Sequence, residues 1–431
     1  MKRVLFISAA PPLPANNGQR MRIWSLLRAL SWEGYEIHLL TFARPEEIES
    51  YAGELAHVCR TFEAVPLTLP SWSSGGNYLR RVRGLFSPIP FGVERFRSAE
   101  MARRIEARLG EPFSVVIADS VYSAINLPDR IGPPLIIDDN NIEHMILKRY
   151  LVTDRNPVRR LYIRLEWWKL RGWERRACSR SSMVMLCSET DRAVMREMCP
   201  DALVMMVPNI IDVDSYQPAP ACQNATVLYL GSMDWLPNRD AVDFLATEIL
   251  PELRKRVPQV RFVVTYSPER APPESYRERL ARTPNLEFVP TNDVRKEVAD
   301  AAVFVVSLRI GSGTRFKILE AGAMAKAIVS TRVGAEGLDF VNGEEIVLVD
   351  APFAFAGAVA KLLEDKEMRI RLGRGARRRV EEQYDFSMLR RRLADALGQL
   401  AARSELSSNE GTQELRLKSV VPASHSNQSR T

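Results

Sequence analysis

The sequence predicts an α/β protein built from two doubly wound parallel-sheet domains. Apolar strand-like runs alternate with helical segments through most of the chain, and this order is typical of parallel sheets covered by helices. The chain has 431 residues, too many for one ordinary core, and its hydrophobic content of 46% allows two domains to be well packed. A proline-containing segment at 207–220 separates two sets of strands and is interpreted as the interdomain linker.

The first set of elements predicts a domain over residues 1–207. It opens on a buried strand at Val4–Ser8 and not on a signal peptide, because only about seven apolar residues precede a proline-rich loop. Helical spacing of apolar residues follows at Arg20–Trp32. The further strands are expected at Ile37–Phe42, Ser114–Ala118, Leu135–Asp138 and Met183–Cys187.

The second set predicts a domain over residues 208–385. Its strands are expected at Ala225–Leu230, Arg261–Thr265, Leu286–Val289, Ala302–Leu308 and Ala327–Thr331. A C-terminal helix at 386–403 is expected to cross back onto the first domain. The remaining tail, 404–431, is rich in Ser, Asn and Gln and is expected to be disordered.

Composition restricts the function classes. The formal net charge of +7 favours anionic partners, and nucleotide diphosphates and acidic membrane surfaces fit equally well. No nucleic-acid-binding motif is present in the sequence, so nucleic acid is not expected as a partner. The five cysteines and four histidines are scattered, which predicts a reduced compartment and no metal site. No apolar stretch approaches the roughly 20 residues that cross a bilayer, so we expect a cytoplasmic protein, with attachment to the inner membrane face as an option.

The segment 307–338 carries the strongest functional signal. A buried strand leads into a loop with Gly311, Ser312 and Gly313, and a helix begins near Phe316. Arg315 and Lys317 add positive charge beside the amides of a helix N-terminus, which favours anions. Glu320 follows one turn later, where a carboxylate can accept hydrogen bonds from sugar hydroxyls. These residues together predict a phosphate and ribose site.

The same segment resembles the donor-binding motif of glycosyltransferase family 4, and GSGTRFKILEA is similar to the loop GGGTRLKILEA of one branch. Glu320 matches the second of the paired glutamates of the family, while Ser312 stands in place of the first. The resemblance implies a GT-B fold, in which two Rossmann-like domains face a central cleft. It also implies a nucleotide-sugar donor bound by the second domain, an acceptor bound by the first, and no required cofactor or metal.

The start of the second domain resembles the same branch over VLYLGSMDWLPNRDAVDFL. Ser232 and Pro237 occupy the positions at which typical members have an Arg and a Lys that bind the donor diphosphate. We therefore expect Arg315 and Lys317 to stabilise the leaving diphosphate instead. The donor-binding residues are predicted to be Gly231, Ser232, Asp234, Ser312, Gly313, Thr314 and Glu320, with Asp234 equally consistent with a turn.

Two segments of the first domain are candidate acceptor-side loops. Gly18 precedes a helix and permits close approach to a ligand, although a helix-cap role is an equal alternative; Arg20 and Arg22 are expected as surface charges. Asn140, Asn141 and Glu143 resemble a family pattern of Asp, His, Asn, any residue and Glu, with Asn140 in place of the histidine. Glu143 and the strand-terminal Asp138 fit substrate contact and helix capping equally.

The predicted catalytic residues are Arg315, Lys317 and Glu143. The resemblance implies transfer, with retained anomeric configuration, of a sugar from a nucleotide-sugar to a polysaccharide, glycolipid or other glycan acceptor, including a lipid-linked one. A nucleotide-sugar epimerase and a non-catalytic nucleotide-sugar-binding protein remain as alternatives. The segments 77–96 and 159–176 mix aromatic residues with arginines, which suits a membrane surface, but packing on their own domain is the simpler interpretation.

Overall fold

The computed structural model describes residues 2–67, 84–153, 156–219, 222, 224–311 and 313–419. For residues 153 and 404–419 only the backbone is described. The predicted Ser312, residues 77–83 of the predicted segment 77–96, and the tail beyond residue 419 therefore lie outside the described residues.

The first domain has a seven-stranded parallel sheet in the order β3-β2-β1-β4-β5-β6-β7. Its strands are β1 Arg3–Ser8, β2 Glu36–Phe42, β3 Thr61–Val65, β4 Val115–Asp119, β5 Leu135–Asp138, β6 Met183–Leu186 and β7 Val204–Met206. Its helices are α1 Gly18–Trp32, α2 Pro45–Glu49, α3 Ala52–Ala56, α5 Phe91–Glu94, α6 Ala99–Leu109, α7 Ser120–Ser123, η1 Ala124–Asn126, α8 Glu143–Thr153, α9 Pro157–Arg180 and α10 Glu189–Met198. Two apolar cores, one on each face, bury the central strands.

The second domain has a six-stranded parallel sheet in the order β10-β9-β8-β11-β12-β13. Its strands are β8 Thr226–Leu230, β9 Arg261–Tyr266, β10 Leu286–Pro290, β11 Val303–Val306, β12 Ala327–Ser330 and β13 Val347–Leu348. The helical elements are η2 Val213–Ser215, α11 Leu236–Phe244, η3 Leu245–Ile249, α12 Leu250–Arg256, η4 Pro268–Arg270, α13 Glu274–Ala281, α14 Arg295–Asp300, α15 Phe316–Ala323, α16 Pro352–Glu364 and α17 Lys366–Gln383. The predicted fold class, two parallel-sheet α/β domains, is confirmed.

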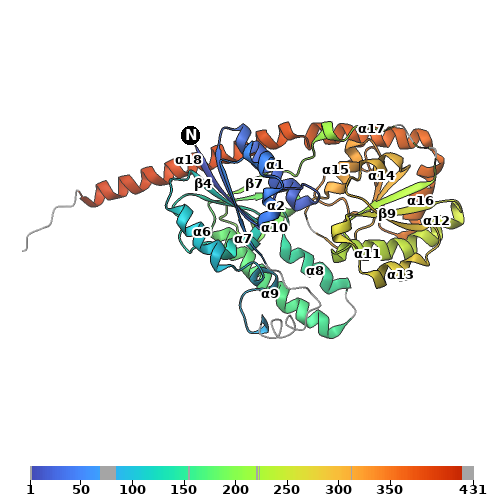
Figure 1. Cartoon of the computed structure of the whole chain (residues 1–431), viewed down its shortest axis with the longest axis horizontal. Helices are drawn as coiled ribbons and strands as arrows, with labels where there is room; N and C mark the ends of the chain where they lie inside the picture. Colours follow the sequence, from blue (N-terminus) through green and yellow to red (C-terminus); the bar gives the residue numbers. More distant parts are fainter. Residues whose placement is uncertain are drawn as a thin grey trace, which may run out of the picture.

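The last helix, α18 (Phe386–Ser419), returns from the second domain to the first (Figure 1). Leu389, Leu393 and Leu397 share a core with Leu26 and Leu30 of α1. Burial of these apolar side chains ties the C-terminal segment to the first domain. The helix continues past residue 403, where the sequence predicts the start of the tail.

The strand order locates the ligand crevice. In open parallel sheets ligands bind beyond the carboxyl ends of the strands, where the strand order reverses direction. In the first sheet this point lies between β1 and β4, and in the second between β8 and β11. Both points face the space between the domains, so their loops define the site (Figure 1).

Candidate functional site

A cavity of about 400 Å³ lies between the two domains and is lined by the loops at both switch points. Ten predicted site residues line it: Gly18, Asn140, Asn141 and Glu143 from the first domain, and Gly231, Ser232, Thr314, Arg315, Lys317 and Glu320 from the second. Phe316, predicted only as the start of a helix, lines it as well. Gly313 and Asp234 do not line the cavity. The carboxyl ends of β1, β5, β8 and β11 thus bring together residues that are up to 304 positions apart, as Asn16 and Glu320 are.

The loop after β11 folds Arg315 over its own glycines. Arg315 is 5% exposed, and its Nη1 donates to the carbonyl oxygen of Gly313 at 2.7 Å. A Cβ atom at Gly311 would lie 2.3 Å from Nη2 of Arg315, so the glycine makes room for the guanidinium group. Burial lowers the pKa of Arg315 to about 10. The guanidinium group of Arg315 is therefore held at the cavity wall although burial disfavours its positive charge.

Lys317 lies in the first turn of α15, two residues after Arg315. Its Nζ donates to Oδ1 of Asn238 at 2.9 Å and to the hydroxyl of Tyr229 at 3.3 Å. The ammonium also lies over the Tyr229 ring, 4.5 Å from its centroid. Burial and then the positive charge of Arg315 lower the pKa of Lys317 to about 7. An anion in the cavity would relieve both effects.

Glu320 lies one helical turn after Lys317. Its Oε1 accepts a hydrogen bond from the hydroxyl of Tyr216 at 3.1 Å. Burial raises its pKa to about 7. Near neutral pH this carboxyl group is therefore only partly ionised, and its ionised form can accept hydrogen bonds from sugar hydroxyls.

The loop after β8 is held by Asn238. The Asn238 amide donates to the carbonyl oxygen of Ser232 at 2.9 Å, and a Cβ at Gly231 would lie 2.7 Å from Cγ of Asn238. Asp234 accepts from Nε of Arg270 at 2.9 Å. Arg270 itself lines the cavity and was missed by the sequence analysis. Only its position just after β9, which neighbours β8 in the sheet, could have indicated it.

On the first-domain wall, Glu143 opens α8. Its Oε2 accepts from the hydroxyl of Tyr122 at 2.9 Å, and its backbone N–H donates to Oε1 of Glu174 at 2.8 Å. Burial raises the pKa of Glu143 to about 7. Asn140 stands where the motif has a histidine, and the nearest histidine in the sequence is His144. His144 does not line the cavity and pairs with Glu174.

Three glycines allow the domains to touch. A Cβ at Gly18 would lie 2.9 Å from the Phe316 ring, and one at Gly313 would lie 1.9 Å from Oδ1 of Asn141. Gly313 also has φ of +71°, which disfavours other residues. Gly337 approaches Ser188 in the same way, with its Cβ position 2.8 Å from the serine Cβ.

Arg22 corrects one expectation of the sequence analysis, because it is buried and not a surface charge. Its Nε donates to Oδ2 of Asp138 at 2.7 Å, so Asp138 forms an internal ion pair and does not contact the cavity. Nη1 of Arg22 donates to Oδ1 of Asn209 in the linker at 3.0 Å. The Asn209 amide in turn donates to Oγ1 of Thr314 at 2.6 Å, which links the first domain to the loop after β11.

Side chains of α8 also reach the second domain. Nη2 of Arg149 lies 2.6 Å from Oε1 of Glu336, which follows β12. Among the residues that the structure describes, no group of three or more His, Cys, Asp or Glu side chains could hold a metal ion.

Comparison with known proteins identifies the second domain most directly. Residues 224–365 match the family model "Glycosyl transferases group 1". The chain is 20% identical over 396 residues, 89% of this chain and 97% of the other, to an uncharacterized 44.6 kDa protein in the cps region of Klebsiella pneumoniae. It is 33% identical over 124 residues, 27% of this chain and 29% of the other, to D-inositol 3-phosphate glycosyltransferase of Corynebacterium glutamicum.

Similar solved structures cover almost the whole chain. A sucrose-phosphate synthase of Thermosynechococcus elongatus has a TM-score of 0.69 at 17% identity, covering 94% of this chain and all of the other. Anabaena HepE in complex with UDP has a TM-score of 0.61 at 14% identity, covering 93% of this chain and all of the other. The chain therefore has the GT-B fold, and its residues 224–365 match the group 1 glycosyl transferases.

Proposed function

We propose that the protein is a glycosyltransferase that moves a sugar from a nucleotide-sugar to a glycan or lipid-linked acceptor. The observation that carries this proposal is the interdomain cavity, where Arg315, Lys317 and Glu320 face Glu143 across the domain boundary. The match of the second domain to group 1 glycosyl transferases supports the same activity. Transfer between two substrates requires both to be held in one water-poor site, and a cleft between two domains provides it.

The donor diphosphate is assigned to the second-domain wall. Lys317 and Arg315 lie two residues apart. Burial lowers the pKa of both, and the positive charge of Arg315 lowers that of Lys317 further. A leaving nucleoside diphosphate gains negative charge as the glycosidic bond breaks, and preorganised cations stabilise that charge most. Arg270, at the same cavity, is a further cation within this wall. Glu320 is assigned to the ribose hydroxyls.

The acceptor is assigned to the first-domain wall. Glu143, with a pKa raised to about 7 by burial, can accept a hydrogen bond from an acceptor hydroxyl or take up its proton near neutral pH. The Tyr122 hydroxyl donates to Glu143 and fixes the orientation of its carboxylate. We further propose that the anomeric configuration is retained, that no metal or other cofactor is needed, and that the protein acts in the cytoplasm.

Two measurements test the proposal. Purified protein is first screened for a raised melting temperature with UDP-, GDP- and ADP-sugars, because a ligand bound only by the folded state stabilises it. Product analysis then follows with and without glycan acceptors, with and without EDTA. Acceptor-dependent transfer that survives EDTA, and an unchanged anomeric coupling constant by NMR, are expected.

The variants Lys317→Met and Glu320→Gln should bind the donor more weakly, whereas Lys361→Met, which changes an exposed lysine of α16, should bind it as the wild type does. Glu143 in the cavity also fits the acid/base carboxylate that an epimerase would need. Isomerised nucleotide-sugar formed without acceptor would favour that second function. Stabilisation by a nucleotide-sugar without any turnover would show a binding protein and refute the transferase.

A further inference from the structure

Exposed apolar side chains gather on one part of the first domain. Of the ten exposed large hydrophobic residues in the described part of the chain, six lie on α8, α9 or the segment just before α5. These six are Leu85, Phe86, Val152, Val158, Leu161 and Trp168, and we call them the apolar patch. Phe86 is 89% exposed and Trp168 is 69% exposed. Figure 1 shows α8 and α9 side by side, extending away from the first sheet.

The segment that carries Leu85 and Phe86 is fixed to α9 by hydrogen bonds. Nζ of Lys169 on α9 donates to the carbonyl oxygen of Gly84 at 2.6 Å and to that of Leu85 at 3.2 Å. Glu166 on the same helix accepts from the backbone N–H of Phe91 at 2.7 Å. Polar groups on the buried side of α9 therefore fix the segment that carries Phe86 against this helix.

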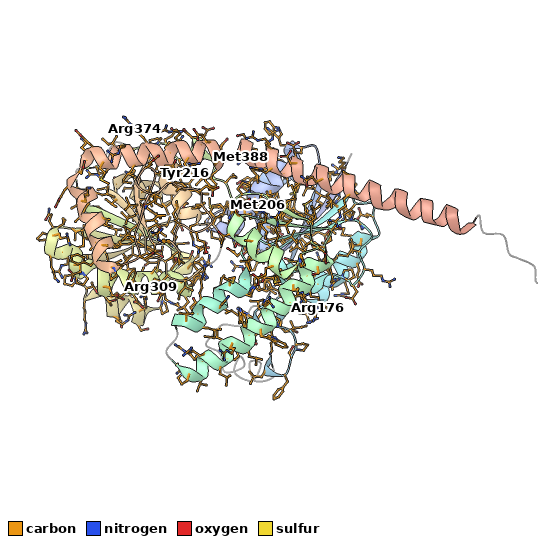
Figure 2. The ribbon with its side chains drawn as sticks, turned by 180° about the vertical axis from the view of Figure 1, so that it is seen from behind. Arg176, Met206, Tyr216, Arg309, Arg374 and Met388 are labelled. Carbon is orange, nitrogen blue, oxygen red and sulfur yellow. The ribbon has the colours of Figure 1, made fainter. Side chains whose placement is uncertain are left out.

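Charge on α9 is divided between its two sides. Both acidic residues of the helix, Glu166 and Glu174, are buried. Arg160, Arg164, Arg175 and Arg176 are exposed, and among the described residues none of these four has a carboxylate within ion-pair distance. Arg176 is labelled in Figure 2, on the side of α9 seen from behind. The outward charge of this helix is therefore positive.

Apolar and basic residues share one face of α9. Leu161, Arg164 and Trp168 are spaced i, i+3 and i+7, which places them on the same side of a helix. Apolar side chains flanked by arginines are the pattern that lies in the headgroup region of a membrane, where the rings enter the acyl boundary and the guanidinium groups meet phosphates.

We propose that the apolar patch and the arginines of α9 form a docking surface for an anionic membrane. This inference rests on the proposed function and specifies its acceptor as one carried by a lipid. Glu143 at the cavity and Val152 in the patch lie on the same helix, nine residues apart, which corresponds to about 14 Å along the axis. A membrane-bound acceptor can therefore place its glycan end beside Glu143 while its lipid stays in the bilayer.

Sedimentation with vesicles tests this surface. The full chain is mixed with vesicles of phosphatidylcholine alone or with added phosphatidylglycerol, at low and high salt. We expect binding to the anionic vesicles that weakens with salt. The double variant Phe86→Ser/Trp168→Ser should bind at least about tenfold more weakly because it loses most of the inserted apolar area. Arg160→Gln/Arg164→Gln should weaken binding by about fivefold per arginine.

The matched control is Phe353→Ser, which removes a 62% exposed phenylalanine on the second domain. It should bind vesicles as the wild type does. Equal binding to neutral vesicles, no binding at all, or an equal loss in Phe353→Ser overturns the proposal. A dimer that the Phe86→Ser/Trp168→Ser variant breaks would assign the surface to a second copy and also overturns it. Donor-induced stabilisation is measured in parallel, and it should persist in both surface variants, so failure of docking is separable from failure of the transferase assignment.

Discussion

The lowered pKa of Lys317 leads to a prediction that can be measured directly. Burial and the Arg315 guanidinium lower this pKa to about 7, against an ordinary value of 10.5. A nucleoside diphosphate would place negative charge beside the ammonium group, and opposite charge favours the charged form. Binding should therefore raise the pKa of Lys317 back toward its ordinary value. At pH 8 the protein should take up a proton as the diphosphate binds.

The size of the uptake follows from the two pKa values. A group with a pKa of about 7 is roughly 10% protonated at pH 8, and the same group near its ordinary pKa is almost fully protonated. The expected uptake is thus about 0.9 proton per site. By linkage, the affinity for the diphosphate should fall by up to about tenfold between pH 8 and pH 9.

Glu320 acts in the opposite direction. Burial raises its pKa to about 7, and binding of ribose hydroxyls to its carboxylate favours the ionised form. Its contribution to affinity should therefore increase as pH rises through 7. Together the two groups predict an affinity maximum near neutral pH, in which Lys317→Met removes the alkaline limb and Glu320→Gln weakens the acidic one.

Isothermal titration calorimetry provides the assay. The nucleoside diphosphate identified by the thermal screen is titrated at pH 8 in two buffers with different ionisation enthalpies, and the difference in apparent enthalpy gives the protons taken up. The uptake should disappear in Lys317→Met and remain in Lys361→Met. If the wild type takes up no proton, or Lys317→Met takes up as many as the wild type, the diphosphate does not lie beside Lys317.

Three further changes test other parts of the molecule. Gly313→Ala places a methyl group against Oδ1 of Asn141, at a residue whose φ of +71° disfavours alanine. The variant should therefore have a more open cleft and transfer sugar at least about tenfold more slowly. Small-angle scattering should show a larger radius of gyration, and an unchanged radius would contradict this. Arg22→Met leaves the buried Asp138 carboxylate unpaired and should lower the free energy of unfolding by about 3–5 kcal/mol in urea denaturation, whereas a loss below about 1 kcal/mol would show that Asp138 is neutral or solvated. Glu143→Gln removes a group whose pKa is raised to about 7, so kcat should fall and lose its dependence on pH near 7, while donor affinity measured by calorimetry stays unchanged.

The sequence predicted the central strands because they are buried on both faces. β1, β4, β8 and β11 are continuous apolar runs, which is the pattern of a strand covered by helices on both sides. The strands β3, β7 and β13 were not predicted. All three lie at sheet edges or beside them and are partly exposed, so their sequences lack a clear apolar run. Edge strands are defined by their neighbours more than by their own residues.

The same distinction between local and distant contacts applies to the site. Arg315, Lys317 and Glu320 lie within one loop and one helical turn, so their spacing alone placed them together. Arg270 and Tyr216 reach the same region from other elements, and no local pattern connects them to it. Arg22 on α1 pairs with Asp138 at the end of β5, 116 positions away, and no local sequence pattern indicates this pair. For that reason Arg22 was predicted to be an ordinary surface charge.

The two kinds of buried cation in this chain show how the cavity differs from the core. Arg22 is matched by the Asp138 carboxylate, and this pair holds the linker in place. Lys317 instead donates to a neutral amide and a neutral hydroxyl, and its pKa falls to about 7. A lysine kept for packing would gain from a carboxylate partner, because an uncompensated ammonium destabilises the fold at neutral pH. Glu320 offsets a part of this cost, and an anion in the cavity would offset the rest, so the electrostatics of α15 are those of a binding site. The stability of the fold should report this directly. Lys317→Met should raise the melting temperature of the protein alone at pH 7, and the diphosphate should stabilise the wild type more than the variant.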